Sequence, residues 1–389
     1  MDLSAEAVSL QSWMTGIRRD IHRHPEIGFQ ERRTADLVAK HLAAMGMEVA
    51  TGIGGTGVVG TLRAGTGTRT IGLRADMDAL PMQESSDKPY QSIHGGIFHG
   101  CGHDGHIAML LGAARAISES RDFDGAVHFI FQPAEEGLGG ALAMMQDGLF
   151  QRFPCDMIYG LHNWPHLPLG TFGVRPGPMM AAFSTFDINI KGIGGHAAMP
   201  HTTIDPVIAA ASLIQSLQSI VSRVLDPVDA AVVSVTQLHG GSAYNIIPDL
   251  VALSGCCRYF SDLNGQKISA EMIRRAQMTA AASGATAEVA IKEIYTILLN
   301  EEEETVRCAD IAAAIVGEAH VVKDHPPIMA SEDFAFMLRE VPGCYILMGA
   351  GDPDHACMVH NPGYDFNDEA LVVGATYWQR LVEAALRKP

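Results

Sequence analysis

The sequence predicts an α/β fold, a mostly parallel sheet with helices on both faces that is interrupted by an inserted ferredoxin-like α+β domain. The chain has 389 residues, more than one hydrophobic core usually organises, so two domains are the default expectation. Strand-like and helix-like segments alternate over the first part of the chain, which is typical of a parallel sheet. After the Pro-Gly-Pro at 176–178 the order becomes strand–helix–strand–strand–helix–strand, that of a ferredoxin-like unit.

The first domain is expected at residues 1–179 and, after the insertion, again at 293–389. Its chain should bring the carboxyl ends of several parallel strands to one edge, where ligands bind in such sheets. We expect helices at 3–23, 33–45, 104–118 and 138–149, a glycine-rich hairpin at 51–70, and strands at 71–73, 127–131 and 156–161.

The inserted domain is expected at 180–292. Residues 183–191 alternate between apolar and polar side chains, as a half-exposed antiparallel strand does. Asp205 and Pro206 predict a helix start, with Asp as N-cap and Pro at the first helical position. The remaining elements are a helix continuing to about 225, strands at about 230–238 and 250–259, a helix at about 264–283 and a strand at about 286–292.

The composition is that of a globular chain with an acidic balance. Hydrophobic residues make up 47% and charged residues 18%. The formal net charge of −17 argues against nucleic acid or an anionic membrane as a partner, although a local arginine can still bind a small anion. No signal peptide or bilayer-spanning apolar stretch is visible. Seven cysteines, an odd number, fit a reducing compartment, so we expect a cytoplasmic location.

Carboxylates and an imidazole follow directly on several strand-like runs. Asp76 and Asp78 follow one run, Glu135 and Glu136 follow a second, and His162 ends a third. Adjacent glutamates at a strand end point in different directions, so one can hold a metal while the other handles protons. Taken alone, the pair would be better explained as a solvated acidic turn. Its coincidence with two other strand ends favours a metal-dependent hydrolytic site.

Eight motifs in order along essentially the whole chain resemble the M20 metallopeptidase superfamily. The similarity is closest to its amidohydrolase branch of hippurate hydrolases, N-acyl-amino-acid deacylases and auxin-conjugate hydrolases. The resemblance implies a catalytic domain bearing an inserted dimerisation domain, and hence a homodimer or a higher homo-oligomer. The motifs are RADMDALP (74–81), HGCGHDGH (99–106), FQPAEEG (131–137), GLHNWP (160–165), GGHAAMPH (194–201), NIIP (245–248), SEDF (331–334) and HNPGYDFND (360–368).

The resemblance also implies which residues bind metal. Two positions separate this chain from typical aminopeptidases and carboxypeptidases of the superfamily: Asp76 stands where other branches have a histidine, and Cys101 where they have a bridging aspartate. By the same resemblance Glu135 is the general base and five side chains are metal ligands: Cys101, His103, Glu136, His162 and His360.

This ligand set can be read chemically. One thiolate, three imidazoles and one carboxylate suit zinc, manganese, cobalt or nickel, and do not suit calcium. Five ligands exceed a closed structural site, so we expect two divalent ions per subunit, which a Cys101 thiolate could bridge. The alternatives for Cys101 are a reactive nucleophile or an inert buried thiol. Glu135 would take a proton from a water whose pKa the metal lowers to roughly 7, and pass it to the leaving amine.

Other residues are expected to bind substrate or support the ligands. His196 is the candidate donor to the carbonyl oxygen, and the resemblance implies that it reaches the active site of the other subunit. Arg258 could fork onto a substrate carboxylate with Asn245 as a partner, although a surface ion pair is the alternative for a lone arginine. Three aspartates are expected behind the ligands: Asp76, Asp78 and Asp104.

The expected activity is metal-dependent hydrolysis of the amide bond of small N-acyl amino acids. One alternative is a dipeptidase on the same scaffold, which would need a pocket for a free α-ammonium group. A second is a non-catalytic metal-binding homologue, against which the intact Glu135 and full ligand set argue.

Overall fold

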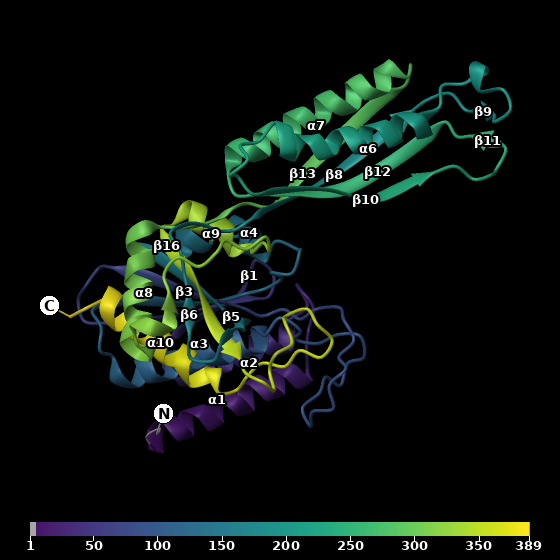
Figure 1. Ribbon diagram of the computed structural model, residues 1–389. Helices are drawn as coiled ribbons and strands as arrows, with labels where there is room; N and C mark the ends of the chain where they lie inside the picture. Colours follow the sequence, from purple (N-terminus) through teal and green to yellow (C-terminus); the bar gives the residue numbers. More distant parts are fainter. Residues whose placement is uncertain (1–4, 389) are drawn as a thin grey trace. The chain divides into compact units, whose positions relative to one another are not determined.

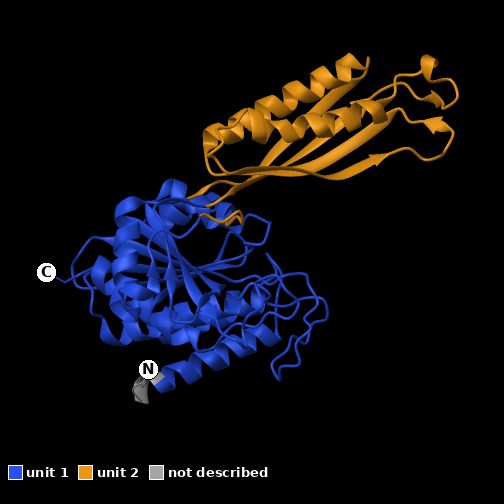
Figure 2. Cartoon of the chain, in the orientation of Figure 1, with its two compact units in different colours: residues 1–179, 299–326, 333–389 blue, residues 180–298, 327–332 orange. Residues whose placement is uncertain are grey.

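The computed structural model describes residues 5–388, which form two compact units (Figure 2). Unit 1 contains the chain up to Met179, Leu299–Pro326 and the chain from Asp333 onward. Unit 2 contains Met180–Leu298 together with Pro327–Glu332. None of the helices in the described chain is long and apolar enough to cross a membrane.

Unit 1 is built on an eight-stranded mixed sheet in the order β1-β2-β4-β3-β5-β16-β6-β15 (Figure 1). The four central strands β4, β3, β5 and β16 are parallel, while β1 and β2 join antiparallel at one edge. The expected mostly parallel sheet is confirmed. The strands are β1 (Glu48–Ile53), β2 (Gly57–Ala64), β3 (Thr70–Asp76), β4 (Gly125–Gln132), β5 (Met157–Pro168), β6 (Phe172–Gly173), β15 (Val321–Val322) and β16 (Gly343–Gly351).

Helices cover both faces of this sheet, and every residue of β4 is therefore buried. On one face Phe129 belongs to the core that includes residues of α1, α3 and α10. On the other face Phe334 of α9 contacts Tyr345 of β16, with ring centroids 5.8 Å apart. The helices are α1 (Ala5–Arg23), α2 (Arg32–Ala44), α3 (His103–Ser120), α4 (Gly140–Gln146), α5 (Leu149–Arg152), α8 (Glu302–Val316), η2 (Glu318–His320), α9 (Phe334–Glu340) and α10 (Ala370–Ala385).

One expected helix of unit 1 is wrong in its extent. A single helix was predicted over 138–149, but the chain forms α4 and then the short α5. Gly148 separates them with a left-handed φ of 84°, which ends the first helix. Gly148 was the sequence signal from which the break between the two helices could have been predicted.

Unit 2 is a four-stranded antiparallel sheet in the order β10-β12-β8-β13, with helices α6 and α7 (Figure 1). The order of elements along the chain matches the predicted strand–helix–strand–strand–helix–strand pattern. Asp205 caps α6 as expected, since its carboxylate accepts the Val207 N–H at 2.8 Å. The elements are β8 (Ala182–Lys191), α6 (Pro206–Arg223), β10 (Ala231–Gly240), β12 (Leu250–Tyr259), α7 (Asp262–Ala282) and β13 (Thr286–Tyr295).

Smaller elements complete the chain. The two-stranded pair of β9 and β11 belongs to unit 2, beside the 3-10 helix η1. A second pair, β7 with β14, lies where the chain passes from one unit to the other. Their bounds are β7 (Gly177–Met180), β9 (Gly195–His196), η1 (Pro200–Thr202), β11 (Ile246–Ile247) and β14 (Leu298–Asn300).

Candidate metal centre and active site

The five predicted metal ligands come together in unit 1. The thiol of Cys101 and imidazole nitrogens of His103 and His162 all lie within 4.8 Å of one another. The same thiol also lies within 4.8 Å of ligand atoms of Glu136 and His360, which form a second such group. Cys101 is therefore common to two three-residue clusters, the arrangement that a ligand shared by two metal ions would have.

Local backbone geometry explains how the first cluster forms. Cys101 and His103 flank Gly102, the N-cap of α3, which has a left-handed φ of 88°. A Cβ at this glycine would lie 2.5 Å from Asn163 Oδ1 and from the Tyr364 hydroxyl oxygen. Only glycine fits both the conformation and the space. The Cys-Gly-His motif therefore depends on its glycine to bring both ligands to the start of the helix.

Hydrogen bonds orient the imidazoles of the first cluster. The Nδ1–H of His103 donates to the backbone carbonyl of Asp78 at 2.8 Å. The Nδ1–H of His162 donates to the carbonyl of Asn163 at 2.7 Å. A metal ligand must be a neutral imidazole with one N–H, and in that form these bonds would leave the lone pair on each Nε2 for the cluster. The His162 Nε2 lies 3.4 Å from the Cys101 sulfur.

Unpaired buried atoms indicate that the cluster is built for a cation. Within the described residues, His103 Nε2 is buried without a hydrogen-bond partner. Glu136 Oε1 lies 3.1 Å from His360 Nε2 but makes no hydrogen bond of normal geometry in the described chain. Buried polar atoms left unsatisfied cost free energy, so a bound ion would explain both. The set of sulfur, nitrogen and oxygen donors fits a borderline-soft divalent metal.

The electrostatic surroundings of the cluster are negative. Burial raises the pKa of the Cys101 thiol well above its ordinary value, and Glu136 and Glu135 raise it further. Burial alone would lower the pKa of His103, but Asp76 and Asp78 outweigh it and raise that pKa to about 10. Carboxylates contribute to both shifts, and their excess around the ligands favours binding of positive charge.

The neighbouring glutamates are held by Asp78. One oxygen of its carboxylate accepts the backbone N–H of Glu135 and the other accepts that of Glu136, each at 3.0 Å. One carboxylate oxygen of Glu135, one of Glu136 and an imidazole nitrogen of His103 all lie within 4.8 Å of one another. Glu135 is thus beside the ligands but belongs to neither Cys101 cluster. Asp78 therefore supports the site through two groups: its backbone carbonyl accepts from His103, and its carboxylate accepts the N–H groups of the glutamate pair.

Asp76 connects to His106 and to Arg74, a buried arginine for which the sequence predicted no role. Its Oδ1 lies 2.6 Å from His106 Nδ1, and its Oδ2 accepts from Arg74 Nη1 at 2.7 Å. The Arg74 Nε–H also donates to Gln132 Oε1 at 2.8 Å. Arg74 is 1% exposed, so its charge is balanced entirely inside the protein. A charged residue between the apolar residues of a buried strand was the signal that could have identified it.

Asp104 orients a histidine outside the ligand set. Its Oδ2 lies 2.8 Å from Nδ1 of His22, on α1, and 3.7 Å from Nη1 of Arg18. Burial alone would lower the pKa of His22, but Asp104 and Glu84 raise it to about 9. This buried group ties α1 to the first turn of α3, directly behind His103.

The residues predicted to bind substrate lie in unit 2, in two places. His196 and Asn245 are neighbours at β9 and β11, where Ala197 N–H donates to the Asn245 carbonyl at 3.0 Å. Arg258 lies near the other end of β12, roughly 26 Å from Leu250 at about 3.3 Å per residue. Within unit 2 of a single chain, His196 and Asn245 are therefore not close to Arg258.

The Arg258 guanidinium already has partners in unit 2. Its Nη1 donates to the Met329 carbonyl at 2.6 Å and to Ser331 Oγ at 2.9 Å. The guanidinium carbon lies 4.5 Å from the centre of the Phe183 ring. These contacts fix the side chain and differ from the surface ion pair considered as the alternative.

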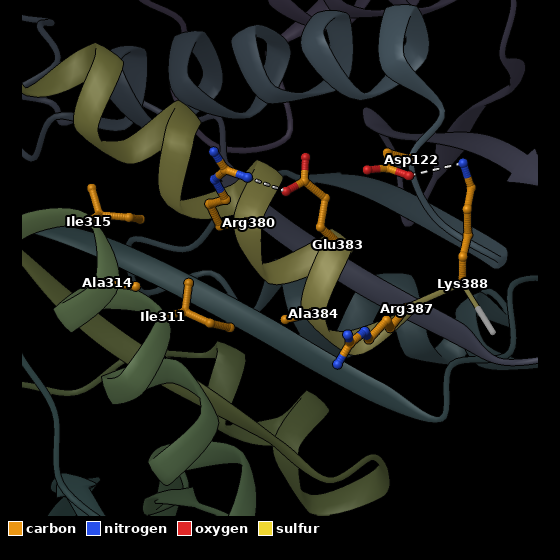
Figure 3. Close-up of a pocket in the computed structure, with 9 residues that line it drawn as sticks. All are labelled: Asp122, Ile311, Ala314, Ile315, Arg380, Glu383, Ala384, Arg387 and Lys388. Carbon is orange, nitrogen blue, oxygen red and sulfur yellow. Dashed lines mark hydrogen bonds and ion pairs between the residues drawn. The ribbon is translucent and has the colours of Figure 1, made fainter.

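Two surface pockets of unit 1 lie away from these residues. One, of about 530 Å³, lies between α8 and α10 and is lined by Ile311, Ile315, Arg380 and Glu383 among others (Figure 3). The other, of about 730 Å³, is lined by residues of α2 and by Glu26. Neither pocket includes a candidate ligand from the described residues. The candidate site is identified by its chemistry rather than by concavity.

An α/β sheet that places imidazoles and carboxylates around a shared cysteine thiol is the architecture of a metallohydrolase. The chain belongs to the peptidase family M20/M25/M40, whose model matches residues 72–384. It is 41% identical to the hippurate hydrolase of Campylobacter jejuni subsp. jejuni, over 98% of each chain. It is 38% identical to the N-acetyl-L-cysteine deacetylase of Bacillus subtilis, over 97% of this chain and 89% of the relative.

Solved structures agree with this assignment. The crystal structure of the Bacillus subtilis YXEP protein, a dinuclear metal-binding peptidase from the M20 family, superposes with a TM-score of 0.87. It is 32% identical, and the match covers 98% of this chain and 99% of that chain. The resemblance inferred from the eight motifs is confirmed.

Proposed function

We propose that this protein is a metal-dependent amidohydrolase that cleaves the amide bond of N-acyl amino acids. The observation that carries the proposal is the position of Cys101 in two ligand clusters at once, with Glu135 beside them. Relatives named for hydrolysis of hippurate and deacetylation of N-acetyl-L-cysteine support the substrate class. The products would be a carboxylic acid and a free amino acid.

Two divalent ions per subunit would be held by the predicted ligands. His103 and His162 would bind one ion, Glu136 and His360 the other, and Cys101 would bind both. Zinc, manganese, cobalt and nickel all fit this donor set. When bound, such a pair supplies Lewis-acid polarisation of the amide carbonyl and lowers the pKa of the attacking water.

Glu135 is the proposed general base. Its side chain is 6% exposed and lies among the carboxylate and imidazole groups of Glu136 and His103. It would accept a proton from the attacking water and donate that proton to the leaving amine nitrogen as the C–N bond breaks. Asp78 would keep this carboxylate in place by holding the Glu135 N–H.

Residues of unit 2 would complete the site in a homodimer. We assign residues 180–292 as a dimerisation domain inserted into a catalytic domain of 1–179 and 293–389. His196 would donate to the developing oxyanion in the partner subunit's site, with Asn245 beside it, and Arg258 would act on the substrate carboxylate. Exposed apolar side chains near β9 and β11 support an interface there: Ile193, Leu238, Tyr244, Ile246 and Leu250.

A substrate and metal screen tests the proposal. The chain would be stripped with a chelator, reloaded with zinc, manganese, cobalt or nickel, and assayed on N-acetyl, N-benzoyl and indole-acetyl amino acids. Hydrolysis restored by at least one metal is the expected result. Faster cleavage of dipeptides with a free amino terminus would support the dipeptidase alternative. No hydrolysis by metal-loaded protein would support the non-catalytic alternative.

The cytoplasmic location stays a prediction.

A further inference from the structure

The backbone turn that carries Glu135 and Glu136 has an unusual conformation. Ala134, the residue before the pair, has a φ of 53°. This left-handed region is sparsely populated by residues that have a Cβ, because the Cβ approaches the backbone closely. The surrounding structure must therefore hold the turn in place.

Buried carboxylates hold the turn through its backbone. The N–H of Ala134 donates to Glu31 Oε1 at 2.8 Å. The next two N–H groups, those of Glu135 and Glu136, go to the carboxylate of Asp78. The other oxygen of Glu31 accepts from the Thr56 hydroxyl at 2.5 Å. Three successive N–H groups thus end on two carboxylates that lie far from them in the sequence.

Glu31 is aimed at this turn rather than at its own helix. It occupies the N-cap position of α2, where a side chain often accepts N–H groups of the first helical turn, but its side chain makes no capping bond. Glu26 does that work instead, because its carboxylate accepts the N–H groups of Arg33 and Thr34 at 3.0 and 2.9 Å. Glu31 is fully buried, so its carboxylate has its partners inside the protein.

The chain before Glu31 packs directly on the same turn. A Cβ at Gly28 would lie 2.9 Å from the Ala134 Cβ and 2.8 Å from Leu138 Cδ1. The glycine lets residues 27–31 approach the turn closely. This segment belongs to the N-terminal stretch HRHPEIGFQE, to which the ligand chemistry assigns no role.

We propose that Glu31 is a positioning residue that sets the directions of Glu135 and Glu136 through the Ala134 N–H. The inference rests on the proposed function, in which Glu136 holds metal and Glu135 moves the proton. Glu31 belongs to neither Cys101 cluster and acts only by fixing the backbone from which the two glutamates extend.

The test replaces Glu31 with Ala and measures two independent properties. The first is the dissociation constant of Mn²⁺ or Zn²⁺ alone, from competition with a chromophoric chelator and without substrate. The second is kcat and KM for hydrolysis. Removing an outer partner of a metal site typically costs about 10–100-fold in metal affinity or activity. Glu31→Ala should therefore weaken metal binding and lower kcat by about 10-fold or more, with a smaller change in KM.

Glu26→Ala is the matched control. It removes a carboxylate from the same segment that also accepts backbone N–H groups, but those groups belong to α2. It should lower the unfolding temperature while metal affinity and kcat remain those of the wild type. A purely structural role for Glu31 would give the same pattern in Glu31→Ala, and that result would overturn the proposal.

A second substitution tests the route through Ala134. Glycine adopts a left-handed φ without steric cost, so Ala134→Gly added to Glu31→Ala should recover part of the lost metal affinity and kcat. No recovery in a folded double variant counts against the route. If Glu31→Ala does not fold, Thr56→Val, which removes one partner of Glu31, should shift both readouts the same way by about 3-fold. An unchanged Thr56→Val would then count against Glu31.

The two readouts separate this inference from the proposed function. If the wild-type chain binds metal but hydrolyses no N-acyl amino acid, the proposed function fails. A metal affinity weakened in Glu31→Ala, but not in Glu26→Ala, would still support Glu31 as a positioning residue.

Discussion

The ligand cluster of unit 1 and the β9–β11 end of unit 2 hold the predicted site residues in opposite surroundings. His103 is fully buried, and its Nδ1–H is committed to a backbone carbonyl. His196 is exposed, and its Nδ1 accepts an N–H from Ala198, two residues along the chain. The imidazole of the first histidine has a partner distant in sequence, whereas the imidazole of the second accepts from a residue of its own turn, although its backbone pairs with Ile246 of β11. The predicted ligand in unit 1 is therefore buried and oriented by its own unit, whereas the predicted donor in unit 2 is exposed.

The largest expected effect comes from the proposed base in unit 1. Glu135→Gln should lower kcat by about 10²–10⁴-fold, because the carboxylate that carries the proton is lost. Metal content should stay that of the wild type, since Glu135 is in neither Cys101 cluster. Elemental analysis and steady-state kinetics on the same preparation provide the measurement. Glu136→Gln is the matched control, and it should lose metal as well as activity. A Glu135→Gln variant with near wild-type turnover would show that the assigned base is wrong.

A complementation experiment tests whether unit 2 acts on a second subunit. His196→Ala chains and Glu135→Gln chains would each be nearly inactive alone. A mixed dimer has one site that takes Glu135 from one chain and His196 from the other. Random pairing makes half of the dimers mixed, each with one good site of two, so activity should recover to about a quarter of the wild-type value. The readout is hydrolysis after reversible dissociation and mixing.

Native mass spectrometry of the mixture serves as the control for that experiment. Mixed dimers without recovered activity would contradict a His196 supplied by the partner, and the ligand cluster of unit 1 would then have to work without it. Chains that stay monomeric yet active would remove the proposed dimer.

The smallest expected effect concerns the buried group that fixes α1 behind the ligands. His22 has a folded-state pKa of about 9, above its ordinary value of 6.5, so its protonated form stabilises the fold. This contribution is complete below about pH 6.5 and is lost as the pH rises toward 9. One pKa unit corresponds to about 1.4 kcal/mol, so the contribution is at most about 3 kcal/mol. Denaturant unfolding of wild type and His22→Gln at pH 6 and pH 9 measures it.

His128→Gln is the control for that measurement. Burial lowers the pKa of His128 to about 4, so the folded histidine is neutral at both pH values, and only its unfolded form, with a pKa of 6.5, titrates between them. Its contribution is therefore below about 1 kcal/mol and opposite in sign to that of His22. If the free energy of unfolding of wild type and His22→Gln changes in parallel between pH 6 and pH 9, the proposed charge on His22 is absent.

Local patterns in the sequence were enough for most elements and for the choice of ligand residue types. The apolar alternation at 183–191 predicted β8, and Asp205-Pro206 predicted the start of α6, because both signals depend only on neighbouring residues. The motif resemblance singled out Cys101, His103, Glu136, His162 and His360, and the structure places these five together.

Only the tertiary structure decided which buried charges meet. Asp104 was expected to orient a histidine behind the ligands, and the histidine that it contacts is His22 of α1. Glu31 reaches the Ala134 N–H across the chain, and Arg74 is matched to Asp76 and Gln132 inside the sheet. The physical reason is that a buried charge needs a partner, but many different groups of opposite charge or hydrogen-bonding type can be that partner. The local sequence therefore shows that a partner is needed but not which residue it is. Which partner satisfies it depends on where the packed strands and helices place the backbone.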